Sequence, residues 1–540
     1  MPKLSFLSLI RNSDPEIDER PSVDELQARL TNQTEELVST AKDQRKPDGV
    51  ELTFKAFEEL LLPMIFALAR TVIMLFLAAA EEREAQRIPS RLEREGRVFR
   101  PAPAQARNIE TWFGVVRYWR TYMREVGDGV RHGFYPLDVV LGLTADRVSM
   151  TLLGVAVRMA TKMSFAEARL VLGWFLPTIP SVEVIENAVL GFGRHTAAWF
   201  CSGAPPFVGD GEVLIIMFDS KGVPTATQAE MKKRRRRRRK GSTAKSPRHR
   251  GRRNRKRRGR RPRRKKGDKS KNAKMSTLVV MYTLKRHGKY LLGPINRWMY
   301  ASFAVKKHAF AIAKREASKR GFGPDSGKLV QMVTDGDLDL ACYAKEFFPD
   351  AIHTVDVMHV LEKLWSAGEC LHREGSKELQ KWFDTQRDKL YDGKVGKVLA
   401  SLRKHLNAIP KTGPGNKGKR GRLSNAISYI EKRIDQMNYD ELLAKDLEIS
   451  SGPVEGAVKH VVGRRCDHGG MRWCKERAEA VLQLRCIELN GHWDTFIQYV
   501  HDRLREEALQ GGKRIRLQTN EPAPLPDFVE NPQQSLEKVA

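Results

Sequence analysis

The chain has 540 residues, more than one hydrophobic core usually supports, so we expect several structural units. Hydrophobic residues make up 41% of it, which excludes a wholly disordered polypeptide. The formal net charge is +31, but residues 231–274 hold 27 Lys or Arg and one acid, so that segment alone carries +26. Six scattered cysteines, none in a Cys-x-x-Cys pair, indicate reduced intracellular thiols and argue against a disulfide framework.

The first 105 residues divide by composition into two regions. Residues 1–50 are polar with little periodicity, and we expect them to be loosely ordered; their first apolar run is too short for a signal peptide. Residues 51–105 favour helix. Within them, residues 60–80 are apolar over the length of a membrane span, but Arg70 at the middle would cost about 2.5–3.5 kcal/mol in a bilayer. We therefore expect a buried helix and no membrane contact.

Residues 106–210 combine strand and helix patterns. The β-branched and aromatic run 109–123 predicts a hairpin or a pair of strands. Helices follow to about residue 199, with capping-box spacing between Ser164 and Glu167 and a second helix opening at Ser181. These two short helices could form a helix-turn-helix that binds DNA, although an ordinary helical pair explains the pattern at least as well.

From residue 211 the pattern changes to α/β. Val213 to Phe218 are nearly all β-branched or large and apolar, as in a strand buried on both faces, and Asp219 ends the run. Further strands are expected at 275–284, 289–295, 328–334 and 351–360, separated by helices at about 302–321 and 338–348. This order predicts a mixed α/β sheet flanked by helices over 211–364. A helical insertion over 365–450 follows, then helices over 451–505, and a Pro-rich tail over 506–540 that we expect to be disordered.

Three acids stand at the ends of these expected elements. Asp219 and Asp335 each close an apolar strand, and Glu455 lies in the first turn of a late helix, where Pro453 fixes the start and the helix dipole favours a carboxylate. Carboxylate oxygens suit Mg²⁺, and a pair of such ions can clamp the oxygens of a phosphoryl transfer. Each acid alone is weak evidence, because an aspartate after a strand is often a turn residue. Asp337 and Asp339 also compete with Asp335.

Longer blocks around these acids carry a family resemblance. The run LVQMVTDGDLDLACYAKEFFPDAIHTVDVMHVLEKLW from 329, with Asp335-Gly336, Phe348-Pro349 and Asp356 to His359, resembles the DDE transposases of Kra-type bacterial insertion sequences. Those enzymes are related to Lre-type and, more distantly, to mutator-type transposases. The block from 449, ISSGPVEGAVKHVVGRRCDHGGMRWCKERAEAVLQLR, looks like their C-terminal signature, with Gly470, Met471 and Trp473 in its Gly-Met-x-Trp element. The resemblance spans roughly residues 105–500.

The resemblance implies an RNase H-like catalytic fold, with a helical insertion before the catalytic glutamate. It assigns Asp219, Asp335 and Glu455 as the catalytic residues that bind two metal ions, Mg²⁺ or Mn²⁺. It assigns Asp356 and His359 as supporting residues. It also implies DNA partners with terminal inverted repeats, a homo-oligomer on DNA, and a bacterial cytoplasmic protein that joins the nucleoid when DNA-bound. From the residues alone, His359 after a strand is more simply a structural histidine.

The basic segment 231–274 exceeds the basic linker of the family. It repels itself and has almost no apolar content, so we expect it to be disordered when free and to bind DNA without sequence preference. A solvated tether and a localisation signal are alternatives. The expected DNA contacts are arginines of this segment and of the C-terminal signature: Arg234, Arg235, Arg236, Arg237, Arg238, Arg239, Arg252, Arg253, Arg257, Arg258, Arg260, Arg261, Arg263, Arg264, Arg464 and Arg465. A zinc site at Cys466, His468 and Cys474 fits no common finger spacing.

The sequence therefore favours a DNA transposase that cleaves insertion-sequence ends and transfers the 3′-hydroxyl to target DNA. One alternative is a related RNase H-like nuclease that cuts without joining. Another is a non-catalytic nucleic-acid-binding protein whose basic segment supplies all the activity, although such a protein would need none of the three acids.

Overall fold

The protein was analysed as a computed structural model, which describes residues 19–42, 53–94, 96–127, 133–231, 273–468, 471–511 and 516–526. The chain divides into two compact units. The first consists of Met1–Trp199 with His492–Ala523, and the second of Phe200–Gly491 with Pro524–Ala540. The helices expected over 451–505 are thus divided between the units, because the chain crosses from one to the other at residue 491.

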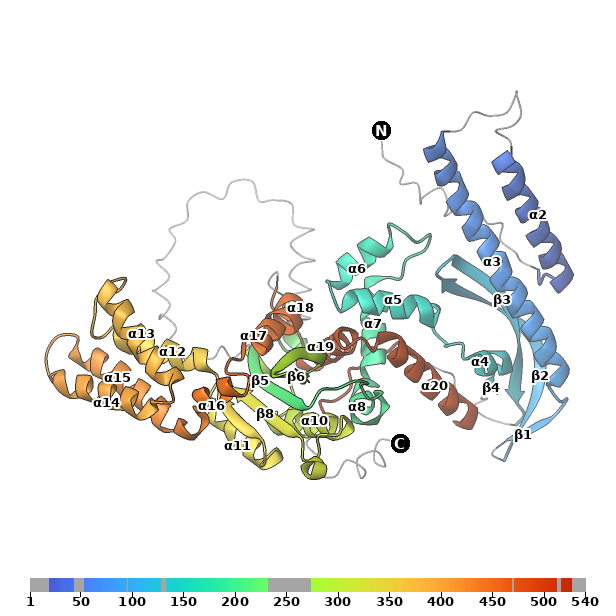
Figure 1. Ribbon diagram of the computed structural model, residues 1–540. Coiled ribbons are helices and arrows are strands. Elements are labelled where there is room, and N and C mark those ends of the chain that lie inside the picture. The colour runs from blue at the N-terminus through green and yellow to red at the C-terminus, as the bar shows by residue number, and fades with distance from the viewer. Residues whose placement is uncertain are drawn as a thin grey trace, which may run out of the picture. The chain divides into compact units, whose positions relative to one another are not determined.

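The first unit begins with two helices and a small antiparallel sheet (Figure 1). Its elements up to the sheet are α2 (Val23–Lys42), α3 (Phe54–Arg87), β1 (Leu92–Arg94), β2 (Arg97–Thr111), β3 (Gly114–Glu125) and β4 (Gly133–Phe134). The strands form one sheet in the order β1-β2-β3-β4. Strands β2 and β3 are the hairpin expected at 109–123, and its turn joins Thr111 to Gly114.

Helix α2 corrects the expectation that residues 1–50 are loosely ordered. A capping box starts it: the amide of Glu25 donates to Oγ of Ser22, and the amide of Ser22 donates to the carboxylate of Glu25. Leu26 is buried, in a cluster with Met74 and Leu77 of α3. An apolar stripe on an otherwise polar helix is enough to hold it against a neighbour.

Helix α3 is buried on one face only, which corrects the expectation of a buried helix. Arg70 and Glu81 lie on the buried face: Arg70 donates to the carbonyl of Phe113, and Glu81 accepts from the amide and hydroxyl of Thr121 on β3. In the part of the chain that the structure describes, α3 is the one helix long and apolar enough to cross a membrane by length and composition. Of its most apolar stretch, 28% is buried.

Residues 92–94 and 97–105 are strands, where the sequence predicted helix. The helix ends at Arg87, and Pro89 follows its C-cap Ile88 closely, as expected of a residue that cannot continue a helix. Strand β2 then contains Pro101 and Pro103. The register of β2 with β3 shifts between Ala102 and Gln105, and such an irregularity accommodates proline in a strand.

The remaining elements of the first unit are helical. They are α4 (Pro136–Leu141), α5 (Met150–Ala160), α6 (Phe165–Leu172), α7 (Val182–Gly193), α8 (Thr196–Ala198) and α20 (Trp493–Gly511), with the π-helix Trp199–Gly203 at the boundary. The expected capping box of Ser164 and Glu167 is present, and Ser181 caps α7.

Of the tail that we expected to be disordered from residue 506, the structure describes residues 506–511 and 516–526. Helix α20 continues to Gly511. The amide of Leu517 then donates to Asp146, and that of Thr519 donates to the carbonyl of Asn187. Leu517 is buried. Residues 527–540 of the expected tail lie outside the described residues.

The second unit is built on a mixed sheet of five strands, as the sequence predicts. They are β5 (Val213–Pro224), β6 (Ala273–His287), β7 (Tyr290–Ser302), β8 (Leu329–Thr334) and β9 (Ile352–Val355). Their order is β7-β6-β5-β8-β9. Strands β5, β8 and β9 are parallel, and β6 is antiparallel to both of its neighbours.

Helices pack on this sheet and extend beyond its β9 side (Figure 1). Those on or beside the sheet are α10 (Lys306–Lys319), α11 (Leu338–Phe347), α12 (Val357–Gly368), α17 (Gly452–Val458), α18 (Arg464–Cys466) and α19 (Lys475–Leu489). The insertion expected over 365–450 holds α13 (Lys377–Tyr391), α14 (Val395–Ala408), α15 (Asn416–Glu431) and α16 (Tyr439–Ala444). Short turns complete the unit: 3-10 turns at Pro324–Ser326 and Ile434–Gln436, and the π-turn Lys459–Gly463. Phe218 of β5 stacks on Phe310 of α10 with ring centroids 3.8 Å apart.

Helix α19 packs along the outer side of β7 and contacts its backbone through side chains. The side chain of Asn490 accepts from the N–H of Met299 through its oxygen and donates to the carbonyl of Met299 through its nitrogen. Glu479 accepts from the N–H of Phe303 and from the hydroxyl of Ser302. Between them, Cys486 accepts a hydrogen bond from the N–H of Ala301.

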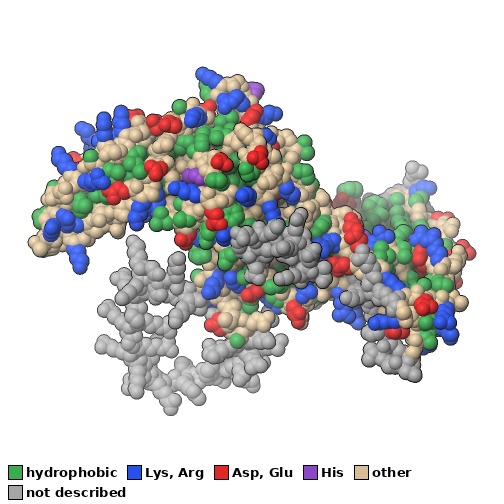
Figure 2. Space-filling model, turned by 90° about the horizontal axis from the view of Figure 1, so that it is seen from below, with side chains coloured by type: hydrophobic (Ala, Val, Ile, Leu, Met, Phe, Trp, Pro, Cys, Tyr) green, Lys and Arg blue, Asp and Glu red, His purple; other side chains and the backbone are tan. Residues whose placement is uncertain are grey.

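Charge on the described surface is mixed. On the face shown in Figure 2, Lys and Arg side chains are interspersed with Asp and Glu side chains. This agrees with the sequence, where residues 231–274 hold most of the net positive charge.

Candidate metal centre

Three neighbouring parallel strands bring aspartates to one place on the sheet. In the register of β5 with β8, Phe218 is opposite Thr334, and Thr334 is opposite Val355 of β9. The next residue along each chain is an aspartate: Asp219, Asp335 and Asp356. Because side chains at matched positions of parallel strands project to the same face, the register sets these carboxyl groups side by side.

Asp219 is half-buried and electrostatically coupled to the other acids. Burial raises the pKa of Asp219, and the negative charges of Asp335 and Glu455 raise it further. The amide of Ser220, which donates to Asp219, and the nearby His359 oppose this rise. Close like charges of this kind are costly unless a cation or a proton compensates them.

Glu455 comes from a distant part of the chain and joins the aspartates through α17. Pro453 stands in the first turn of this helix, and Val454 and Val458 are buried where α17 packs on β5 and β6. A ligand atom of Glu455 lies within 4.8 Å of those of Asp356 and His359. Among the described residues, the group whose ligand atoms are close enough to share one ion is therefore Asp356, His359 and Glu455, so it contains one of the three expected ligands and both expected supporting residues. Asp219 and Asp335 are not in this group; Asp219 is linked to Asp335 and Glu455 by electrostatic interaction.

Asp356 is fully buried and has three hydrogen-bond donors. Its carboxylate accepts from Nδ1 of His359 at 2.9 Å, from the amide of Met358 at 2.8 Å and from the hydroxyl of Ser451. Burial by itself would raise the pKa of Asp356, but the bonds from His359 and Ser451 hold it below its usual value. In return, the hydrogen bond with Asp356 raises the pKa of His359.

The turn after Asp335 is held by the helical insertion. Tyr429 of α15 donates its hydroxyl to the carbonyl of Asp335 at 2.9 Å, and Nε of Arg433 donates to the carbonyl of Gly336 at 2.8 Å. The guanidinium of Arg433 also stacks 4.0 Å from the ring centroid of Tyr429. Gly336 has a φ of +82°, a conformation that side-chain-bearing residues rarely adopt.

Asp337 and Asp339, which compete with Asp335 in the sequence, lie differently. Asp337 caps α11 by accepting from the amide of Asp339, and it pairs with Lys306 at 2.7 Å. Although partial burial opposes the shift, the bond from Lys306 lowers the pKa of Asp337. Asp339 is exposed, with Lys306 at 3.7 Å. Of the three, Asp335 is the one that acts electrostatically on Asp219.

With this geometry established, comparisons with known proteins add little. No protein-family model and no curated protein matches this chain. One solved structure that is similar is a transposase. It is the Drosophila P element transposase strand transfer complex, with 10% sequence identity and a TM-score of 0.22. The match covers 66% of this chain and 81% of that chain. A likeness this weak carries no argument about activity.

Two of the arginines expected to contact DNA, Arg464 and Arg465, lie in the part of the chain that the structure describes. Arg464 is exposed, but Arg465 is buried beneath the surface, with its guanidinium 4.7 Å from the ring centroid of Trp473. Arg465 is therefore a packing residue in this structure, which corrects its assignment to DNA. The expected arginines between 234 and 264 lie outside the described residues.

Cysteines and histidines give no zinc site in the described residues. Cys466 is buried, and burial raises the pKa of its thiol to about 12, which disfavours the thiolate that zinc requires. The carbonyl of Cys466 accepts from Nε1 of Trp473. None of the six cysteines forms a disulfide.

Sequence patterns identified the acids but missed the residues that hold them. Ser451, Tyr429 and Arg433 were not singled out, and each touches the centre through one or two hydrogen bonds. Ser451 stands four residues before Glu455 in the C-terminal signature, which is a usable signal. Tyr429 lies in α15 and Arg433 in the turn that follows it, and nothing in this local pattern points to a turn 94 residues away.

Proposed function

We propose that this chain is a metal-dependent DNA strand-transfer enzyme, the transposase of a bacterial insertion sequence. The observation that carries the proposal is the register of β5, β8 and β9, because an aspartate follows each of three matched residues of these strands and Glu455 of α17 lies close to Asp356. The strand order and directions suit an RNase H-like core, and the blocks that resemble Kra-type transposases contain these acids. DNA is the proposed partner, together with further copies of the chain.

The donor set fits hard divalent cations. Asp219, Asp335 and Glu455 supply carboxylate oxygens, which Mg²⁺ and Mn²⁺ prefer, and their mutual repulsion is what bound cations relieve. When bound, two such ions polarise the attacking and leaving oxygens of a phosphoryl transfer. We propose these three carboxylates as ligands, with Asp356 and His359 beside them.

The remaining residues orient the centre. Asp356 accepts a hydrogen bond from Nδ1 of His359, which fixes the ring and favours its protonated form next to the carboxylates. Ser451 holds Asp356 in place, and Tyr429 and Arg433 hold the backbone that carries Asp335. Such fixed groups lower the reorganisation needed during reaction.

The test uses the purified chain, end-labelled DNA from the borders of its own gene, and a supercoiled target plasmid. We expect Mg²⁺-dependent cleavage at the borders and joining of the 3′ ends to the plasmid. Asp219→Asn, Asp335→Asn and Glu455→Gln should each lower both rates at least 100-fold while DNA binding persists. Asp339→Asn is the matched control and should keep its rate, because Asp339 is an exposed acid four residues from Asp335.

Three results would overturn the proposal. Full activity in the Asp335→Asn enzyme would remove the proposed ligand. Activity that persists in a chelator would remove the metal. Cleavage that never leads to joining would make the protein a nuclease instead of a strand-transfer enzyme.

A further inference from the structure

An apolar seam runs along the exposed side of α3. Its members recur at alternating steps of three and four residues: Leu62, Ile65, Ala69, Val72, Phe76 and Ala79. Four of them are large and exposed, from 39% for Leu62 and Ile65 to 60% for Phe76. The seam is about 26 Å long at 1.5 Å per residue. Single exposed apolar residues are common on proteins, but a continuous stripe of this length marks a surface that is covered in use.

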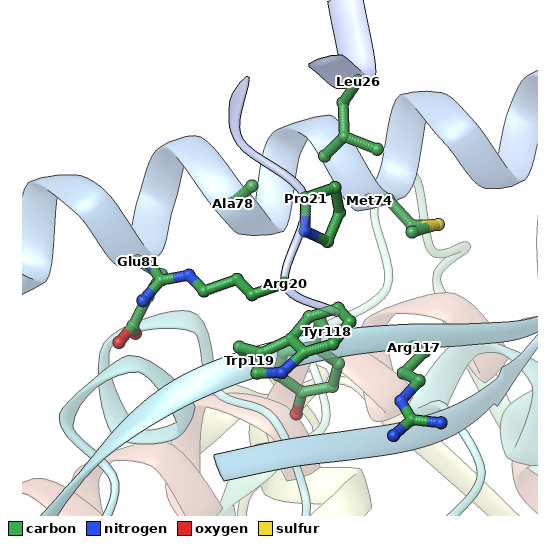
Figure 3. Close-up of a pocket in the computed structure, with 9 residues that line it drawn as sticks. All are labelled: Arg20, Pro21, Leu26, Met74, Ala78, Glu81, Arg117, Tyr118 and Trp119. Atoms are coloured by element: carbon green, nitrogen blue, oxygen red, sulfur yellow. The ribbon is translucent and has the colours of Figure 1, made fainter. Parts of the chain in front are cut away.

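The opposite side of α3 is already occupied. Met74, Ala78 and Glu81 line a small cavity together with Pro21 and Leu26 of the α2 segment and Tyr118 of β3 (Figure 3). Of the described elements, α2, β3 and α4 are those that α3 contacts most. The apolar seam lies on the side turned away from this cluster.

Spacing and charge identify what covers the seam. Steps of three and four residues are the heptad pattern with which two helices pair in a coiled coil. Directly before the apolar run, at the same spacing, stands Glu58, and directly after it stands Arg83. In an antiparallel pair of α3 helices centred between residues 70 and 71, Glu58 of one copy faces Arg83 of the other. The same pairing sets Ile65 against Phe76, and Ala69 against Val72.

We infer that the seam of α3 is a dimer interface, on which a second copy of this chain packs its own α3 in antiparallel orientation. This inference does not rest on the proposed DNA chemistry, since it involves the first unit alone. The buried side of α3 favours a soluble partner over lipid, because Arg70 and Glu81 bind polar groups of β3 and of the turn before it.

The first experiment measures the molar mass of the full chain by light scattering during gel filtration, without DNA and in high salt. We expect a dimer, twice the 61.4 kDa of one chain. Val72→Lys and Phe76→Lys should each raise the dimer dissociation constant at least 10-fold. Val38→Lys is the matched control, since Val38 is as exposed as Val72 but lies on α2, and it should leave the dimer intact.

The second experiment tests the orientation. In a background with the exposed Cys342 changed to serine, the double variant Ile65→Cys/Phe76→Cys should form a covalent dimer under mild oxidation. Ile65→Cys alone should not, because residues 65 of two antiparallel copies lie about 16 Å apart along the helices. Glu58→Arg or Arg83→Glu alone should weaken the dimer, and the two changes combined should restore it.

Other occupants give different results, and each overturns the inference. A monomeric chain that dimerises only when residues 1–18 are removed would show that the chain covers its own seam. A monomeric chain that floats with vesicles of neutral phospholipid, and loses this with Phe76→Lys, would show that the seam binds membrane. A covalent dimer from Ile65→Cys alone would show parallel pairing.

Discussion

The turn at Gly336 gives a quantitative test of how the helical insertion supports the metal centre. Gly336→Ala places a side chain at a φ of +82°, which costs about 1–2 kcal/mol. The added Cβ would overlap the hydroxyl of Tyr429 and lie 2.7 Å from Nε of Arg433, so both side chains must withdraw. Their hydrogen bonds to the carbonyls of Asp335 and Gly336 contribute about 1 and 1.5–3 kcal/mol. We therefore expect the free energy of unfolding to fall by about 3.5–6 kcal/mol.

Urea unfolding followed by circular dichroism measures this loss, and Mg²⁺-dependent DNA cleavage measures its consequence at Asp335. Gly323→Ala is the matched control, because Gly323 has an ordinary φ of −75° and its added Cβ would meet nothing within 4 Å. We expect Gly336→Ala to need more Mg²⁺ for half-maximal cleavage. A stability change no larger than that of Gly323→Ala, with an unaltered Mg²⁺ requirement, would refute the idea that the insertion holds this turn.

Two further predictions follow from the same unit. Replacing residues 232–272 by a short Gly/Ser linker should preserve the fold, because Pro224 and Ala273 are paired neighbours. In anisotropy titrations, the affinity for DNA should fall and its dependence on salt concentration should become shallower; an unchanged salt slope would contradict this. Burial raises the pKa of Glu479 to about 7, so its protonated form is the one that folding favours. Urea unfolding of this protein and of Glu479→Gln, from pH 4 to 8, tests this. Relative to Glu479→Gln, the free energy of unfolding should be greatest below pH 4.5 and should fall by about 3 kcal/mol up to pH 7. Parallel curves for the two proteins would contradict this.

The sequence predicted the second unit better than the first, and the reason is physical. Buried parallel strands such as Val213 to Phe218 are continuous apolar runs, so the run and the aspartate after it are readable from composition. The expectation that Asp219 closes the strand is wrong, because β5 continues to Pro224 through its pairing with β6. The register of the strands is not readable from composition: the alignment of Asp219 with Asp335 depends on how the two strands slide against each other. That alignment emerges only from packing.

The first unit was harder because its signals are local and small. The capping box of Ser22 and Glu25 predicts the start of a helix, but the residues after it are mostly polar. Leu26 is the buried residue of α2, and one apolar position does not show that the helix packs on a neighbour. Pro101 and Pro103 are unusual residues for a strand, yet β2 accommodates them with an irregular register. The ordered segment at Leu517 depends on Asp146, 371 residues away, and no local pattern reports such a contact.

The side chains of α19 along β7 determine how this sheet can grow. An outer strand normally offers a row of free N–H and C=O groups to any extended peptide, its own copies included. Here Asn490 offers one donor and one acceptor to Met299, as a neighbouring strand would, and Cys486 and Glu479 meet the next two outward N–H groups. A helix thus stands in for a sixth strand along Met299 to Phe303, and this part of β7 is closed to the addition of another strand.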